Sequence, residues 1–166
     1  MRVLRAALLV CVVACSSSTG GSSGGSGSVI LPPGIAPFKN ASAAVDAGVY
    51  PGNQKACCFL GPTARLILNK PAGKLVAIFN FYVPKMEPDA SSQTITVAAT
   101  GTSATGSLMG AVGRRIVVSL EFPAAYQNRT MVPVTIAASK SFVPSEIGMN
   151  GDTRRLSVML IKVEYR

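Results

Sequence analysis

The chain has 166 residues, and its sixteen basic and seven acidic side chains give a formal net charge of +9. It contains no histidine and no tryptophan. The lack of histidine removes the commonest general base and every Ser-His or Cys-His catalytic arrangement, and it disfavours a zinc site. The basic residues are scattered rather than interleaved with aromatic residues in a stripe, which argues against a nucleic-acid partner.

The first residues, MRVLRAALLVCVVACSSS, place two arginines before an apolar run that is too short to span a bilayer. This pattern is typical of a signal peptide. The letters VVAC resemble the lipobox of bacterial lipoproteins, which implies a signal peptide over residues 1–14 and a lipidated Cys15. A lipid anchor would make the membrane a partner without a spanning segment. Ordinary secretion, with Cys15 unmodified, is the alternative.

Residues 16–28 are only serine, threonine and glycine, and Pro32, Pro33 and Pro37 follow. Such a segment buries nothing and is typical of a flexible linker. We therefore expect a disordered linker over residues 15–42 and one folded domain over residues 43–166. The residue after the lipidated cysteine is Ser16 rather than an aspartate. A serine at this position favours the outer membrane or cell surface over the inner membrane of a bacterial envelope.

The domain begins with short apolar stretches separated by Gly, Pro, Asn and Ser, which indicates strands rather than helices. RLILNK (65–70) and KLVAIFNFYV (74–83) flank the letters PAG, which favours a hairpin. In the second stretch one face is apolar, and Asn80 and Tyr82 fall on the other. QTITVAATG (93–101) predicts a further strand.

The later stretches alternate in the same way. GRRIVVSLEF (113–122) places Ile116, Val118 and Leu120 inward. TMVPVTIAAS (130–139) contains Pro133, which suggests an edge strand or a bulge. RLSVMLIKVEY (155–165) is apolar on both faces, which is typical of a covered central strand. Together these stretches predict an all-β fold, an antiparallel β-sandwich of the jelly-roll kind.

Two cysteines, Cys57 and Cys58, are adjacent in the sequence of the domain. Neighbouring residues of a strand point to opposite faces, so such a pair does not bridge without strain. We interpret them as a core residue and a near-surface residue. A vicinal disulfide and a disulfide-bridged dimer are the alternatives.

The segment FVPSEIGMNGDTRRL (142–156) fits the pattern F-x-P-x-x-x-G-x-x-x-D-x-R-x-L. It resembles the closing segment of the carbohydrate-binding-module-like jelly-roll domains of bacterial glycosyltransferases and methyltransferases. AGVYPGN (47–53) is similar to the opening segment of that family. The resemblance implies a galactose-binding-like β-sandwich without catalytic activity, which contacts a glycan or a partner domain.

The resemblance leads to two hypotheses for function. The first is an envelope lipoprotein whose domain binds a glycan or another cell-surface component. The second is a structural or protein-interaction module that docks onto an envelope protein of a polysaccharide or export system, which the lack of tryptophan favours because sugars commonly stack on flat rings. The candidate ligand-binding residues are polar-face or turn residues: Tyr50, Arg65, Asn80, Tyr82, Asp152 and Arg154, with Tyr126 as a further ring at a loop tip.

The turn before the last strand offers an alternative to ligand binding. Asn150-Gly151 is a turn signal, and Asp152 follows it. We expect Arg154 to form a fork-like ion pair with Asp152 or with a neighbouring loop, which would fix the strand, and Arg155 to face solvent.

The acidic residues do not indicate an enzyme. Glu87 and Asp89 are close in the sequence, but they lie in a predicted solvated loop, and a glycosidase needs two carboxylates held across a cleft. We therefore expect no catalytic activity and no required cofactor. A calcium ion held by Asp46 and Glu164 is the alternative, although two acids are few for six or more ligands.

Overall fold

The computed structural model describes residues 29–30, 48–51, 58–85, 92–108 and 114–166. The predicted signal peptide, the predicted lipidation at Cys15 and the greater part of the predicted linker lie outside these residues. So do Asp46, Cys57, Glu87 and Asp89. Within the part of the chain that is described, no helix is long and apolar enough to cross a membrane.

The described elements are ten strands and one 3-10 helix. In chain order they are β1 (Val29–Ile30), β2 (Val49–Pro51), β3 (Cys58–Leu60), β4 (Thr63–Asn69), β5 (Val76–Tyr82), β6 (Thr94–Ala99), β7 (Thr102–Ser107), β8 (Arg115–Glu121), η3 (Ala124–Tyr126), β9 (Met131–Ala138) and β10 (Met159–Tyr165).

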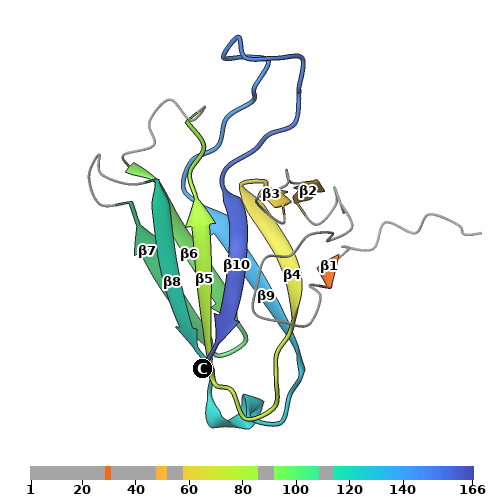
Figure 1. Ribbon diagram of the computed structural model, residues 1–166, viewed down its shortest axis with the longest axis vertical. Coiled ribbons are helices and arrows are strands. Elements are labelled where there is room, and N and C mark those ends of the chain that lie inside the picture. The colour runs from red at the N-terminus through yellow and green to blue at the C-terminus, as the bar shows by residue number, and fades with distance from the viewer. Residues whose placement is uncertain (1–28, 31–47, 52–57, 86–91, 109–113) are drawn as a thin grey trace, which may run out of the picture.

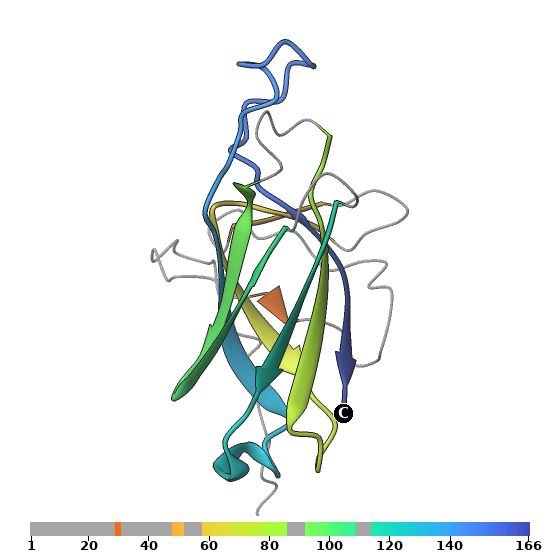
Figure 2. The ribbon, with the colours of Figure 1, turned by 90° about the vertical axis from the view of Figure 1, so that its left-hand side faces the viewer.

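These strands form two five-stranded sheets. The two sheets face each other, as Figures 1 and 2 show. Sheet A has the order β1-β4-β9-β6-β7, and sheet B has the order β2-β3-β10-β5-β8. Neighbouring strands are antiparallel except β1, which runs parallel to β4. The prediction of an all-β sandwich is therefore confirmed. Strand β1 lies within the segment that the sequence predicts to be linker.

The eight strands from β3 to β10 have the order of a jelly roll. They pair as a nested series, β6 with β7, β5 with β8, β4 with β9 and β3 with β10, and successive pairs lie in alternate sheets. This is the pattern of one long hairpin rolled into two sheets. Its innermost turn is the two-residue connection between Ala99 and Thr102, where Gly101 takes a φ of 81° that suits glycine.

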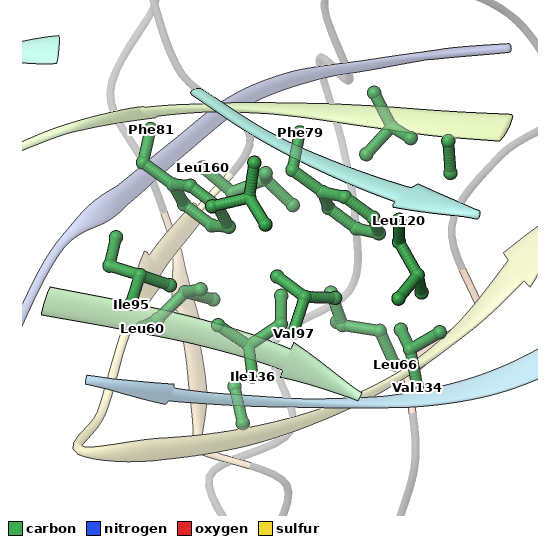
Figure 3. Packing of buried hydrophobic residues seen from close by; sticks show 14 of the residues in the cluster. Leu60, Leu66, Phe79, Phe81, Ile95, Val97, Leu120, Val134, Ile136 and Leu160 are labelled. Atoms are coloured by element: carbon green, nitrogen blue, oxygen red, sulfur yellow. The ribbon is translucent and has the colours of Figure 1, made fainter. Parts of the chain in front are cut away.

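The core lies between the sheets and is built from the alternate residues of each strand. Phe79 and Phe81 of β5 point toward Val97 of β6 and Ile136 of β9 in Figure 3, and all four are at most 2% exposed. The inward faces predicted for β5, β8 and β9 are confirmed. Strand β10 lies between β3 and β5, so its predicted central position is confirmed. The prediction that it is covered on both faces is wrong, because Ile161 and Lys162 are partly exposed.

The predicted hairpin across the letters PAG is wrong. Strand β4 belongs to sheet A and β5 to sheet B, so residues 70–75 cross from one sheet to the other. Lys70 is 1% exposed, and its Nζ donates to the backbone carbonyls of Lys74 at 2.6 Å and Pro71 at 3.1 Å. The Gly73 amide donates to the carbonyl of Gln127 in the β8–β9 connection. These contacts hold the crossing loop against the lower end of the sandwich, near η3 in Figure 1.

Pro133 lies in a central strand and not in an edge strand, so that prediction is corrected. The Ser139 amide donates to Thr94, and the Ala138 amide to Pro62, so the odd-numbered residues of β9 direct their backbone groups toward β6. The pairing of β9 with β6 ends at Thr135. Pro133 therefore occupies the next position that would need an amide for β6, and its missing N–H breaks no ladder.

Cys58 is fully buried and disulfide-bonded. Its place in the core agrees with the sequence-based interpretation, whereas the interpretation of an unbridged side chain is corrected. The other three cysteines lie outside the described residues.

The connection between β9 and β10 projects beyond the upper end of both sheets in Figures 1 and 2. We call residues 142–156 the tip loop. Phe142 and Leu156 close its base through two backbone hydrogen bonds of 2.8 Å, and both are buried. Internal bonds join Ser145 to Asp152 and Met149 to Pro144. The residues of the F-x-P…D-x-R-x-L pattern therefore build the base and the stem of this loop.

Candidate ligand-binding face

The outward positions of sheet B carry a continuous row of side chains across all five strands. Residues paired directly across antiparallel strands share a face. Because Phe79 and Phe81 of β5 point into the core, Tyr82 points outward. The pairings then connect, from one edge of the sheet to the other, Tyr50, Phe59, Met159, Tyr82 and Arg115. We call these five residues the outer row.

The outer row is long, mainly apolar and partly accessible. With neighbouring strands about 4.8 Å apart, five strands span about 19 Å, which is the length of a short oligosaccharide rather than of a single sugar. The rings of Tyr50, Phe59 and Tyr82 are half-buried, and Met159 between them is 6% exposed. Arg115 at the β8 edge is exposed. The row therefore presents aromatic rings on β2, β3 and β5 and a cation at its β8 end.

At the β2 edge the row meets a second arginine. The Arg154 guanidinium carbon lies 5.4 Å from the centroid of the Tyr50 ring, a cation–π distance. Arg154 Nε donates to the two carboxylate oxygens of Asp152 at 2.8 and 3.0 Å, and Nη2 donates to Oδ2. The predicted fork-like ion pair is thus present. The neighbouring Arg155 is exposed, as expected, and its Nη1 donates to Ser141 Oγ at 3.3 Å.

Asp152 is held in its charged form. The hydrogen bonds from the Arg154 side chain and the Arg154 backbone amide lower the pKa of Asp152 to about 2. In turn, this carboxylate raises the pKa of Arg154. The pair therefore stays ionised across the physiological range and fixes the guanidinium beside Tyr50.

Asn80 lies in the next row, between Lys162 of β10 and Val117 of β8. Its Nδ2 is buried and has no hydrogen-bond partner within the described part of the chain. The Asn80 side chain also helps to lower the pKa of Glu164, so its amide lies close to that carboxylate. Val117 beside it is 54% exposed. A polar donor and an apolar surface therefore adjoin the outer row.

Glu164, a candidate for calcium, makes an ion pair instead. Lys162 Nζ lies 2.6 Å from Glu164 Oε1. The hydrogen bond from Lys162 is the main cause that lowers the pKa of Glu164, and the nearby Asn80 amide contributes least. The other candidate, Asp46, lies outside the described residues. Across the described ranges, no three His, Cys, Asp or Glu side chains gather into a group that could hold a metal ion.

Two candidates lie away from this face. Arg65 is on the outward side of β4, in sheet A, where it lines a cavity. Tyr126 is 7% exposed, its hydroxyl donates to the Thr100 carbonyl at 3.1 Å, and Arg129 lies 4.8 Å from its ring centroid. The prediction of a loop-tip ring is therefore wrong for Tyr126, because η3 folds the ring against Phe122 and the core.

The structure thus brings together Tyr50, Asn80, Tyr82, Asp152 and Arg154 on one face and separates Arg65 from them. The sequence did not point to Phe59 and Met159, because an apolar residue beside a core residue looks like core. Their outward orientation could have been inferred from the alternation of side chains along a strand, because each lies next to a buried residue: Cys58 and Leu60 flank Phe59, and Leu160 follows Met159. A β-bulge at Ile161 then shifts the alternation between inward and outward side chains by one residue along the rest of β10.

Comparisons with known proteins give no family for the chain. No protein-family model matches it, and neither the curated proteins nor the solved structures contain a match. The chemistry of the outer row must therefore be judged from its own geometry. That geometry combines three aromatic rings and Met159 with two guanidinium groups at its ends, and the row itself contains no carboxylate.

Proposed function

We propose that this protein is a non-catalytic lipoprotein of a bacterial envelope whose β-sandwich binds a glycan along the outer row of sheet B. The observation that carries the proposal is the pairing of Tyr50, Phe59, Met159 and Tyr82 across four adjacent strands. Aromatic rings bury large apolar area and lose little side-chain entropy on binding, which suits them to the C–H faces of sugars. The sugar hydroxyls then need donors and acceptors beside those rings.

The polar groups that flank the row meet this need. Arg154 lies beside Tyr50 at one end of the row and Arg115 lies at the other end, and both carry guanidinium donors. The net charge of +9, which becomes +7 when Arg2 and Arg5 leave with the signal peptide, favours a glycan that carries anionic groups. The assignment to a lipid-anchored envelope protein rests on the N-terminal sequence and its lipobox-like VVAC.

A glycan array tests the proposal. The full-length protein should bind a subset of surface polysaccharides, and Tyr82→Ala should lose that binding. The matched control is Thr96→Ala, which truncates an outward residue of similar position on sheet A and should bind as the unchanged protein does. Silence across neutral and anionic polysaccharides, or equal binding by Tyr82→Ala, would contradict the proposal.

A second candidate function is supported by the tip loop. Ile147 and Met149 are 37% and 49% exposed at the end of a loop whose backbone is tied by internal hydrogen bonds. A rigid loop that presents two apolar side chains is suited to docking onto a partner protein. If the tip loop is the functional surface, the double change Ile147→Ser and Met149→Ser will remove partner binding and leave glycan binding intact.

A further inference from the structure

The tip loop presents two exposed apolar side chains at its far end. Ile147 and Met149 are 37% and 49% exposed, and Gly148 between them takes a φ of 73° that suits glycine at a sharp turn. Figures 1 and 2 show this end of the loop standing clear of both sheets. The two side chains are therefore placed to contact a partner outside the domain.

The backbone at this end forms hydrogen bonds within the loop itself. The Glu146 amide donates to the Val143 carbonyl at 3.0 Å, and the Met149 amide donates to the Pro144 carbonyl at 3.0 Å. The interior of a bilayer offers no water to replace a lost hydrogen bond, so a segment that enters it must satisfy its own backbone groups. These bonds let the end of the loop enter the boundary between headgroups and acyl chains at little cost.

Two apolar side chains are few for a protein partner. A stable protein–protein interface takes roughly 20–30 residues from each side, whereas Ile147 and Met149 are the exposed large hydrophobic residues of the tip loop. A lipid surface needs less contact, because the binding of a shallowly inserted segment grows with its apolar area and with the attraction between basic residues and anionic lipids. The size of this apolar surface therefore favours a membrane.

Basic side chains gather at the same end of the sandwich. Strand β5 ends there and β8 begins there, as Figure 1 shows. The basic residues of this end are Lys85, Arg114, Arg115, Lys140, Arg154 and Arg155, and the described acidic residues are Glu146 and Asp152. Glu87 and Asp89 follow Lys85 in the sequence, and with them counted the basic residues remain in excess. The charge of this end is therefore complementary to anionic headgroups.

We propose that the tip loop docks on an anionic lipid surface. Ile147 and Met149 insert beside the headgroups, and Arg155 lies at the phosphate level. Glu146 opposes the contact because it carries the same sign of charge as the membrane. This inference assigns the loop a membrane in place of the partner protein of the second candidate function. It is separate from the proposed glycan site, because Ile147, Met149 and Arg155 lie outside the outer row.

Sedimentation of the full-length protein with vesicles tests the proposal. The vesicles consist of phosphatidylcholine, either alone or mixed with phosphatidylglycerol, and contain no saccharide. We expect binding to the anionic vesicles to be about tenfold or more tighter, since each basic residue near the surface contributes about fivefold. Added salt should reduce this preference. The N-terminal residues are the same in every variant, so a difference between variants reports on the domain.

A double variant and a matched control assign the binding to the apolar end of the loop. Ile147→Ser combined with Met149→Ser should weaken binding to the anionic vesicles by about tenfold or more, because apolar area is no longer buried. Met131 is 44% exposed at the start of β9, at the opposite end of the sandwich. Met131→Ser should therefore bind as the unchanged protein does.

A second set of variants tests the charges. Arg155→Gln should weaken binding by about fivefold, whereas Lys74→Gln removes an exposed cation from the lower end and should change nothing. Glu146→Gln removes a repelled charge and should strengthen binding. Melting curves report whether each variant folds, and the expected gain from Glu146→Gln keeps the test decisive if another variant does not fold.

Three results would overturn the inference. The first is binding to anionic vesicles that is no tighter than binding to neutral ones. The second is undiminished binding by the folded double variant, or a loss that Met131→Ser matches. The third is weaker binding by folded Glu146→Gln. Because the vesicles contain no saccharide, a failure here is distinct from a failure of the proposed glycan site.

Discussion

The outer faces of the two sheets differ in chemistry although they enclose the same core. On sheet A, hydroxyl groups pair across β6 and β7, Thr94 with Ser107 at 3.0 Å and Thr96 with Thr105 at 3.1 Å. On sheet B, the matching positions carry the rings and the guanidinium of the outer row. Paired hydroxyls satisfy each other, whereas ring faces gain from a ligand that covers them. The comparison teaches that the outward residues, rather than the shared core, distinguish the face that we propose to bind a glycan from the opposite face.

The largest expected effect is a loss of unfolding free energy from a change in the core that both sheets share. Phe79→Ala empties the centre of the core, where Phe79 is fully buried beside Phe81. A large-to-small change of this kind costs about 3–5 kcal/mol. Denaturant unfolding should show this loss, and glycan binding along the outer row should fall with it. A loss below about 1 kcal/mol would contradict a core that both sheets share.

The second prediction separates the faces. Tyr82→Ala should reduce the affinity for the glycan by about tenfold, because one ring contact of roughly 0.5–1.5 kcal/mol is lost together with its buried area. Thr96→Ala on sheet A should leave that affinity unchanged. Titration of both variants with the best glycan from the array measures the difference. Equal losses from the two variants would show that the faces do not differ in function.

The sequence predicted which residues of a strand face outward but not which sheet the strand joins. The alternation of β5, β8 and β9 follows directly from the apolar residues at every second position, and it placed Asn80 and Tyr82 outward. The connection after β4 could not be predicted in the same way. A proline and a glycine indicate a turn, but the sheet that receives β5 depends on distant contacts such as Lys70 with the Gln127 carbonyl.

The candidate site was partly predictable for the same reason. The ion pair between Asp152 and Arg154 is local, two residues apart, and the turn signal Asn150-Gly151 preceded it. The outer row needs the register of four strand pairs, which joins positions more than a hundred residues apart, Tyr50 to Met159. No local pattern carries that information.

A smaller effect tests the charged edge of sheet B. The Arg154 hydrogen bonds lower the pKa of Asp152 to about 2, against an ordinary value of 3.8. A carboxylate whose pKa is lower in the folded state contributes stability that is complete above the unfolded pKa and is lost as the pH falls through the folded pKa. The pair is partly exposed, so we expect Asp152→Asn to cost no more than about 1 kcal/mol at neutral pH.

Unfolding of both proteins across the acidic range checks the sign. The difference in unfolding free energy between the unchanged protein and Asp152→Asn should be constant above about pH 5, should decline as the pH falls through the unfolded pKa of 3.8 and the folded pKa of about 2, and should vanish only below about pH 1. Asn150→Ala, which removes the acceptor for the Asp152 amide but keeps the carboxylate, is the control and should retain the pH dependence. A difference that grows as the pH falls would show that the ion pair does not stabilise the fold.

The smallest expected effect concerns the hydroxyl pairs of sheet A. Thr96→Val keeps the shape and strand propensity of the residue and removes its bond to Thr105. Because the bond is exposed and water replaces it, the change in unfolding free energy should stay within about 0.5 kcal/mol. Denaturant unfolding measures it, and a loss of more than about 1 kcal/mol would show that this face is more than a solvated cover.

The central claim is that a glycan lies along the outer row of sheet B. It is tested most directly by amide chemical-shift mapping of the full-length protein during titration with the best glycan from the array. The account predicts that the shifts concentrate on β2, β3, β10, β5 and β8, with Tyr50 and Tyr82 among the most affected. Shifts that concentrate on the hydroxyl pairs of sheet A, or on the tip loop around Ile147 and Met149, would contradict it.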